Sequence, residues 1–338
     1  MKKTILDFLR LIRAPLLIGM PLPVLYGAIS VQNLTILNII PLLIIGILSG
    51  IYSFVLNDYI DIDIDRLRSE LSKRPLVSGT ISKKTAKIVI LSCFIGAYLV
   101  IFLFFFRFEI NFFTALAVLI IADILGAIYN IYGKKITGSD LIVALSQSLF
   151  LLFGALIVSS KISIGFITWI LFSLTFLQLF YMNAIAAALK DVDHDYIKKI
   201  RNLAFIFGVK VANNKKFIVP TAFKILGTGI RCTSIFVIFL PFFYYNVKYQ
   251  IIQIALLLIL SIITMYCNFK ILFLKKFDKS KLKKMIMIQL ALHYIIVPII
   301  LISFTNLVII LLITFVPIIW YFLVSYTINE KSLDPQML

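Results

Sequence analysis

Charged and metal-binding side chains are scarce in this chain of 338 residues. Only 14% of the residues are charged and 62% are hydrophobic, with a mean hydropathy of +1.06, which excludes a soluble globular domain. The two histidines and three cysteines have no partners at zinc or redox spacing, so neither zinc nor dithiol chemistry is expected. The sequence also lacks a P-loop, a dinucleotide-binding glycine motif and a Ser-His-Asp arrangement. A membrane protein is the class that remains.

The apolar residues form runs that are long enough to cross a bilayer. About 20 residues of helix span the hydrocarbon core. Because almost all other residues lie in short connections, the sequence predicts an all-α, polytopic transmembrane helix bundle. The predicted spans are 14–31, 36–57, 86–106, 112–130, 140–158, 164–189, 226–245, 250–273, 285–304 and 307–326.

The net charge of +18 reports membrane topology rather than nucleic-acid binding, because the basic residues alternate between the two sides of the predicted bundle. By the positive-inside rule, the N-terminus and both acidic clusters described below face the cytoplasm, in a multi-pass protein of the cell membrane. The loops opposite hold little beyond Arg107, Lys161 and Lys248. The basic loops lie near residues 2–13, 66–87, 134–135, 190–216 and 275–284.

Two acidic clusters follow long apolar runs, four carboxylates in the first and three in the second, so they hold seven of the 15 acidic residues. In a helix, Asn57, Asp61 and Asp65 lie within roughly 80° of one another over two turns. Asp191 and Asp195 repeat the one-turn spacing. Carboxylates this close repel one another unless cations neutralise them, and oxygen ligands suit Mg²⁺ shared with phosphate oxygens.

Basic and aromatic side chains follow the acidic clusters and are candidates for binding an anionic, metal-bound substrate. Arg74 precedes Pro75, which restricts the backbone and fixes the direction of the guanidinium. Lys134 and Tyr129 could line the same mouth, and Lys190 lies directly before the second cluster. The alternatives are that these cations only set topology and that the tyrosine is an interfacial anchor.

Polar residues also occur within the predicted spans. Asp123 lies about halfway along its helix, where a charge is expensive and marks a cavity or a partner. We expect four further polar residues of the spans to form interhelical hydrogen bonds rather than to take part in catalysis: Gln147, Gln178, Asn183 and His293.

The order of these motifs resembles that of the UbiA-type intramembrane prenyltransferases over roughly residues 7 to 304. The resemblance implies a nine-helix bundle whose cytoplasmic loops bind a polyprenyl diphosphate through Mg²⁺. The predicted domains are then the prenyltransferase bundle, 1–304, and an additional C-terminal helix and tail, 305–338. The motifs are Asn57-x-x-x-Asp61-x-x-x-Asp65, Arg74-Pro75-Leu76-Val77-Ser78-Gly79, Tyr129 with Lys134, and Asp191-x-x-x-Asp195.

The resemblance also implies roles for individual residues. Arg74 and Lys134 would bind diphosphate oxygens, and Arg13 looks like the basic residue that often opens the first helix of the family. Lys199 and Leu203 depart from the Gly and Thr common after the second motif. The residues that would hold the Mg²⁺-diphosphate are Asn57, Asp61, Asp65, Asp191 and Asp195.

The function that we predict is Mg²⁺-dependent transfer of a polyprenyl group to an aromatic quinone precursor resembling 4-hydroxybenzoate. Asp123 is a candidate acceptor of the ring proton. The nearest alternative is geranylgeranyl transfer to geranylgeranylglyceryl phosphate, as in archaeal ether lipids. A cation-coupled transporter is the alternative from another class, but transporters place their carboxylates near the midplane rather than at helix ends. Membrane lipids are the expected surroundings, and no nucleic-acid partner is expected.

Overall fold

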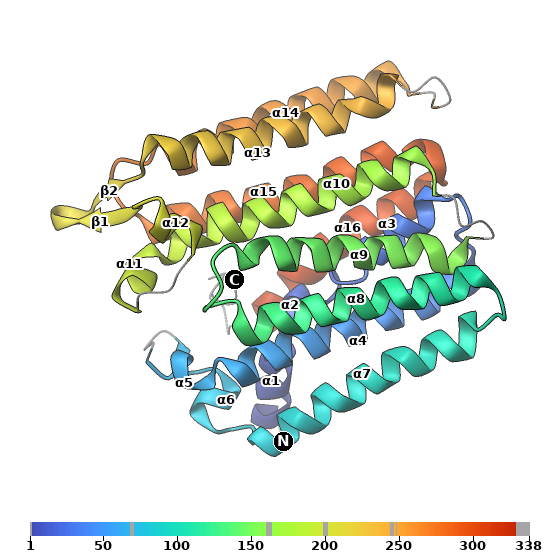
Figure 1. The fold of residues 1–338 in the computed structure, drawn as a ribbon, viewed down its shortest axis with the longest axis horizontal. Coiled ribbons are helices and arrows are strands. Elements are labelled where there is room, and N and C mark those ends of the chain that lie inside the picture. Colours follow the sequence, from blue (N-terminus) through green and yellow to red (C-terminus); the bar gives the residue numbers. More distant parts are fainter. Residues whose placement is uncertain are drawn as a thin grey trace.

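Long apolar helices make up most of the structure, which is a computed structural model. The structure describes residues 2–67, 71–159, 164–198, 202–243, 247 and 249–328. The side chains of residues 2, 3, 36 and 194–198 are not part of that description. Within this part of the chain, nine helices are long and apolar enough to cross a membrane, and a bent N-terminal pair raises the number to ten. The long helices run side by side along one direction (Figure 1). The predicted all-α, polytopic bundle is confirmed.

The helices begin and end close to the predicted limits, with short additional elements between them. Two three-residue strands, β1 (Lys210–Ala212) and β2 (Lys216–Ile218), form an antiparallel hairpin. The helices are α1 (Lys2–Leu11), α2 (Ala14–Leu17), α3 (Leu22–Ser30), α4 (Ile36–Ile60), α5 (Ile62–Asp65), α6 (Pro75–Ser78), α7 (Lys83–Phe105), α8 (Ile110–Tyr132), α9 (Ser139–Val158), α10 (Phe166–Tyr181), the π-helix η2 (Met182–Ala187), α11 (Ala188–Lys198), α12 (Leu203–Ile206), α13 (Thr221–Phe239), α14 (Ile251–Leu272), α15 (Lys279–Leu301) and α16 (Leu307–Ile328).

Two predicted spans differ from the structure. The span 14–31 is divided into α2 and α3, and α1 precedes it at a bend of 45°. The span 164–189 ends too early, because the helix continues through η2 into α11. The break between α2 and α3 falls at Gly19 and Pro21, residues that interrupt or begin helices.

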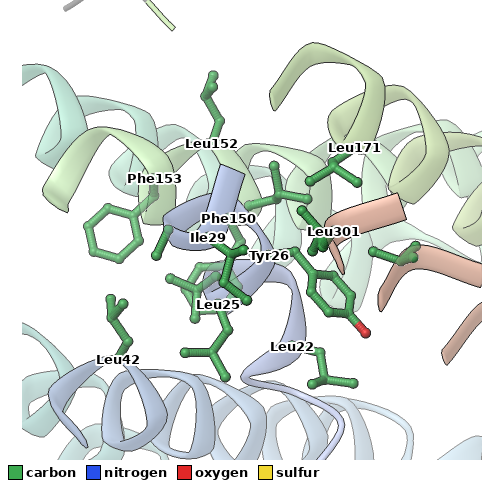
Figure 2. Packing of buried hydrophobic residues seen from close by; sticks show 14 of the residues in the cluster. Leu22, Leu25, Tyr26, Ile29, Leu42, Phe150, Leu152, Phe153, Leu171 and Leu301 are labelled. Atoms are coloured by element: carbon green, nitrogen blue, oxygen red, sulfur yellow. The ribbon is translucent and has the colours of Figure 1, made fainter. Parts of the chain in front are cut away.

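Helix α3 lies at the centre of the main hydrophobic core, and Figure 2 shows its Leu25 and Ile29 among side chains of α9. Two glycines let α3 and α9 approach closely. A Cβ atom on Gly27 would lie 1.9 Å from the carbonyl oxygen of Leu151, and one on Gly154 would lie 2.1 Å from that of Val24. Small residues at such crossings allow close van der Waals packing of the two backbones. This packing drives helix association inside a bilayer, where the hydrophobic effect does not.

The last helix, α16, packs against α2 and α15. The indole Nε1 of Trp320 donates a hydrogen bond to the carbonyl oxygen of Ala14 at 2.7 Å. At the end of α16, the guanidinium of Arg10 donates to the carbonyl oxygen of Ile328 at 3.2 Å. The additional C-terminal helix predicted at 307–326 is therefore present, and it ends beside α1.

Candidate active site

A polar pocket of about 340 Å³ lies at one end of the bundle, between the ends of α4, α8 and α15 and the start of α11. In Figure 1 this end also carries α5 and α6. The pocket brings together side chains that the sequence places far apart. The predicted site residues that line it are Arg13, Asn57, Asp61, Asp65, Arg74, Tyr129, Lys134, Lys190 and Asp191.

The first acidic motif forms the predicted ladder. Helix α4 ends at Ile60, but Asp61 keeps helical backbone angles and joins it to α5. The amide of Asp61 donates to the carbonyl oxygen of Asn57 at 3.0 Å, and the amide of Asp65 donates to that of Asp61 at 2.8 Å. This i to i+4 pattern places the three side chains on one face, and all three line the pocket.

Two cations from other elements contact this ladder. Lys134 Nζ, from the connection between α8 and α9, lies 2.6 Å from Asp61 Oδ1. Arg74, directly before α6, lies 2.6 Å from Asp65 Oδ2. Burial raises the pKa of Asp61, and the Lys134 ammonium opposes that shift. The two cations that the family resemblance assigns to the diphosphate thus lie beside the two carboxylates assigned to Mg²⁺.

Asp58, beside the pocket, is a candidate site residue that the sequence analysis did not single out. Its carboxylate is almost fully buried and accepts hydrogen bonds from Arg13 at 2.6 Å and from Arg74 at 3.0 Å. Asp58 follows Asn57 by one residue and so lies about 100° away from the ladder around the helix. A pattern of residues spaced one turn apart therefore does not include it. Its position within an acidic run opposite two arginines was the available signal.

Arg13 reaches the pocket because the chain bends there. Its backbone is left-handed, with φ 48° and ψ 49°, at the junction of α1 and α2. This conformation is uncommon for a side chain of this size and is held by the surrounding contacts. The guanidinium pairs with Asp58 and lies 5.3 Å from the ring centre of Phe54.

The second acidic motif follows the π-helix η2. A π-turn adds one residue to a helical turn, which rotates the following residues relative to the preceding helix, and such turns occur frequently at functional sites. After it, Lys190 and Asp191 line the pocket together with Asn183 of η2. Lys190 Nζ lies 3.6 Å from Asp191 Oδ2. The side chain of Asp195, the other predicted ligand, is outside the described part.

Further polar residues that were not assigned to the site also line the pocket. Asn57 Nδ2 donates to Asn130 Oδ1 at 3.3 Å. Asn202 accepts a hydrogen bond from the Phe205 amide and begins α12, so the departure at Leu203 falls within a capped helical turn. Lys199, the other departure, lies outside the described residues. The unassigned lining residues are Asn130, Asp140, Asn183, Asn202, Lys279 and Lys283.

Asp123 lies apart from this pocket. Its carboxylate accepts a hydrogen bond from the Tyr98 hydroxyl at 2.7 Å. It lines a small cavity of about 40 Å³ that also includes Gln147. Asn130 lines both spaces and so lies between Asp123 and the acidic clusters.

The donor atoms of the pocket fit Mg²⁺. The described lining residues offer carboxylate and amide oxygens but no histidine or cysteine, which favours a hard cation over zinc. Among the residues that the structure describes, no group of three His, Cys, Asp or Glu side chains is arranged to hold a metal. The protein therefore offers part of a coordination sphere, as Mg²⁺ sites that share phosphate oxygens do.

Comparisons with known proteins agree with this geometry. The model of the UbiA prenyltransferase family matches residues 15–270. A structure described as digeranylgeranylglyceryl phosphate synthase aligns with a TM-score of 0.65 at 20% identity, over 89% of this chain and 98% of that one. A UbiA homolog from Aeropyrum pernix K1 aligns with a TM-score of 0.66 at 14% identity, over 85% and 96%. A UbiA homolog from Archaeoglobus fulgidus bound to GPP and Mg²⁺ aligns with a TM-score of 0.58 at 18% identity, over 86% and 99%. The search of curated proteins gives no match.

Proposed function

Because the chain belongs to the UbiA prenyltransferase family, we propose that it transfers a polyprenyl group from a polyprenyl diphosphate to a lipid-soluble acceptor, with Mg²⁺ at the polar pocket. The observation that carries this proposal is the convergence of both acidic motifs and their cations on one pocket at the end of an apolar bundle. A structural relative is described as bound to GPP and Mg²⁺. The proposed metal ligands are Asn57, Asp61, Asp65, Asp191 and Asp195.

The cations of the pocket bind and stabilise the leaving group. Mg²⁺, when bound with the substrate, supplies Lewis-acid neutralisation of the diphosphate oxygens. Arg74 then turns from Asp65 and Lys134 from Asp61 to the diphosphate, while Asp58 continues to hold Arg13 at the edge of the pocket. The bond between the allylic carbon and oxygen breaks, and its electron pair leaves with pyrophosphate. Stabilising that developing charge is the largest electrostatic task of the enzyme.

The new bond forms between the allylic carbon and the acceptor. Apolar walls below the acidic clusters exclude the water that would otherwise capture an allylic cation. An aromatic acceptor then releases a ring proton. Asp123 is the proposed proton acceptor, since it lies on the membrane side of Asn130 and is hydrogen-bonded to Tyr98.

The acceptor is proposed to carry an anionic group. Lys190 of α11 and Lys279 and Lys283 of α15 line the pocket, in addition to the cations that contact the first motif. An aromatic quinone precursor of the 4-hydroxybenzoate type offers a carboxylate and is our first candidate. A glycerol-phosphate lipid offers a phosphate to the same lysines and is the second, since a structural relative is described as a digeranylgeranylglyceryl phosphate synthase.

The pocket end of the bundle is proposed to face the cytoplasm. Helix α1, the connection between α8 and α9, the β-hairpin and the start of α15 bring lysines and arginines to that end, while the opposite connections that the structure describes contain Arg107. The positive-inside rule then places the active site and the N-terminus on the cytoplasmic side.

Prenyl transfer in nanodiscs tests the function directly. The purified protein is incubated with radiolabelled geranylgeranyl diphosphate and either 4-hydroxybenzoate or geranylgeranylglyceryl phosphate, with Mg²⁺ or with excess chelator. We expect a prenylated lipid with one acceptor and no product in chelator, because the two acidic clusters cannot hold a diphosphate unscreened. Product formation that is unaffected by chelator would refute the proposed site, and release of pyrophosphate with neither acceptor prenylated would refute both acceptor classes.

A further inference from the structure

A second polar cluster, which shares no residue with the lining of the polar pocket, lies within the membrane-spanning part of the bundle. At its centre is Arg231 of α13, only 2% exposed although its helix is one of the predicted spans. The sequence reasoning did not single it out. A charge at this depth is expensive and normally has an ionic partner.

The contacts of Arg231 are all with neutral groups. Its two terminal nitrogens donate hydrogen bonds to Gln178 Oε1 at 2.6 Å and to Gln289 Oε1 at 2.8 Å. The guanidinium carbon also lies 3.5 Å from the ring centre of Tyr181, whose hydroxyl donates to Asn268 Oδ1 at 2.8 Å. Within the part of the chain that the structure describes, no carboxylate forms an ion pair with Arg231. The interhelical hydrogen bond predicted for Gln178 is thus present, and the charge beside it is not balanced by these contacts.

Three N–H groups of this cluster make no hydrogen bond within the described structure: Arg231 Nε, Gln178 Nε2 and Gln289 Nε2. All three side chains are at least nine-tenths buried. The amide orientations follow from Arg231, because both Oε1 atoms accept its hydrogen bonds. Each unpaired donor at this depth carries a desolvation cost, because no water or acceptor replaces the hydrogen bond that it would make in solution.

The same three residues line a small cavity of about 20 Å³. His293 and Ser234 also border it, and the Ser234 hydroxyl already donates to the carbonyl oxygen of Ile230 at 2.9 Å. A space of this size admits one water or one monatomic ion. It excludes a phosphate, a carboxylic acid or any lipid headgroup.

We propose that the cluster of Arg231, Gln178 and Gln289 binds a single halide ion, with chloride as the physiological ligand. A halide accepts several hydrogen bonds at once and neutralises the guanidinium. Water satisfies the cluster less well, because it cannot neutralise the charge of the guanidinium. The ion would tie α10, α13 and α15 together at a position removed from the diphosphate pocket.

The test uses bromide as the probe and measures what the folded protein retains. The full chain is expressed and purified in sodium bromide, exchanged into sodium gluconate, and then denatured, and the released bromide is measured by mass spectrometry. We expect bromide equimolar with the chain. Release no greater than that from Arg231→Met would overturn the proposal and would indicate that water completes the cluster.

Two variants and one control make the result specific. Gln289→Glu places a carboxylate beside Arg231, so the chain supplies its own counter-ion and should release no bromide while remaining folded. If Arg231→Met does not fold, Gln289→Glu still tests the site, because equimolar bromide from this variant would refute the proposed halide binding. Lys224→Met is the matched control: it removes another positive charge from α13, one that also lies over an aromatic ring, Phe273, at 4.6 Å. It should retain bromide like the unmodified chain.

Discussion

Replacing Asp58 by Asn removes one charge and no volume from the edge of the pocket. Asp58 accepts hydrogen bonds from two arginines that line the pocket, Arg13 at 2.6 Å and Arg74 at 3.0 Å. Arg74 keeps a second partner, Asp65 at 2.6 Å. Arg13 keeps a long contact of 3.4 Å with Asn57 Oδ1, its position over an aromatic ring and the weaker attraction of Asp61 and Asp65. The substitution therefore acts mainly through Arg13.

The size of the effect follows from that loss. A hydrogen bond to a charged group contributes about 1.5–3 kcal/mol. If that energy holds the Arg13 guanidinium in the substrate pocket, kcat/KM for prenyl transfer should fall about 10- to 100-fold in Asp58→Asn, since about 1.4 kcal/mol corresponds to tenfold in rate. Asp58 acts through the arginines, so Asp58→Glu, which restores the charge, should recover part of the rate.

Asp63→Asn is the matched control. Asp63 lies in the same acidic run, but its side chain is 83% exposed and it forms a long ion pair of 3.5 Å with Arg66. An exposed pair of this kind contributes little, so the rate should stay within about twofold of the unmodified chain. The assay is initial-rate prenyl transfer in nanodiscs, with size-exclusion profiles to confirm folding. A normal rate in Asp58→Asn, or an equal loss in Asp63→Asn, would refute the reasoning.

Three further outcomes are expected. Asp61→Ala and Asp191→Ala should each lower turnover on the order of a thousandfold, since each removes a proposed metal ligand. Product formation measures the rate, and the size-exclusion profile checks that the protein still inserts and folds. A near-normal rate would remove that residue from the site. Gly154→Ala should lower the melting temperature strongly, because its Cβ would lie 2.1 Å from a backbone oxygen, whereas Gly229→Ala, with open space around it, should not. A cysteine tag placed after Leu338 should resist an impermeant label in intact cells, because α16 ends beside α1; labelling there would contradict the assignment of ten spans.

The sequence predicts the parts of this protein that depend on local repetition. Apolar runs of sufficient length gave the spanning helices, since the bilayer leaves few other ways to satisfy the backbone. The ladder of Asn57, Asp61 and Asp65 was predictable because one helical turn fixes it, and the structure forms it.

What the sequence did not predict depends on contacts between distant segments. The left-handed backbone at Arg13 is held by a carboxylate that lies 45 positions away along the chain. The π-helix before Lys190 has no local signature, and Lys279 was read only as a topology charge although α15 brings it to the pocket. Which face of a helix meets which neighbour is decided by packing, and a single sequence does not record it.

The contact of α16 with the first helices has a consequence for how the protein is made. Trp320 and Ile328 contact the segment on either side of Arg13. The ribosome synthesises these two residues long after that segment. At about 5–20 residues per second, the segment that carries Arg13 waits roughly 15 to 60 seconds for them. During that interval Asp58 and the nascent bundle are already in the membrane. The pocket end of the molecule is then completed by a helix that is translated long after the first segment, so a ribosome stalled before α16 would leave a chain whose first segment lacks these contacts.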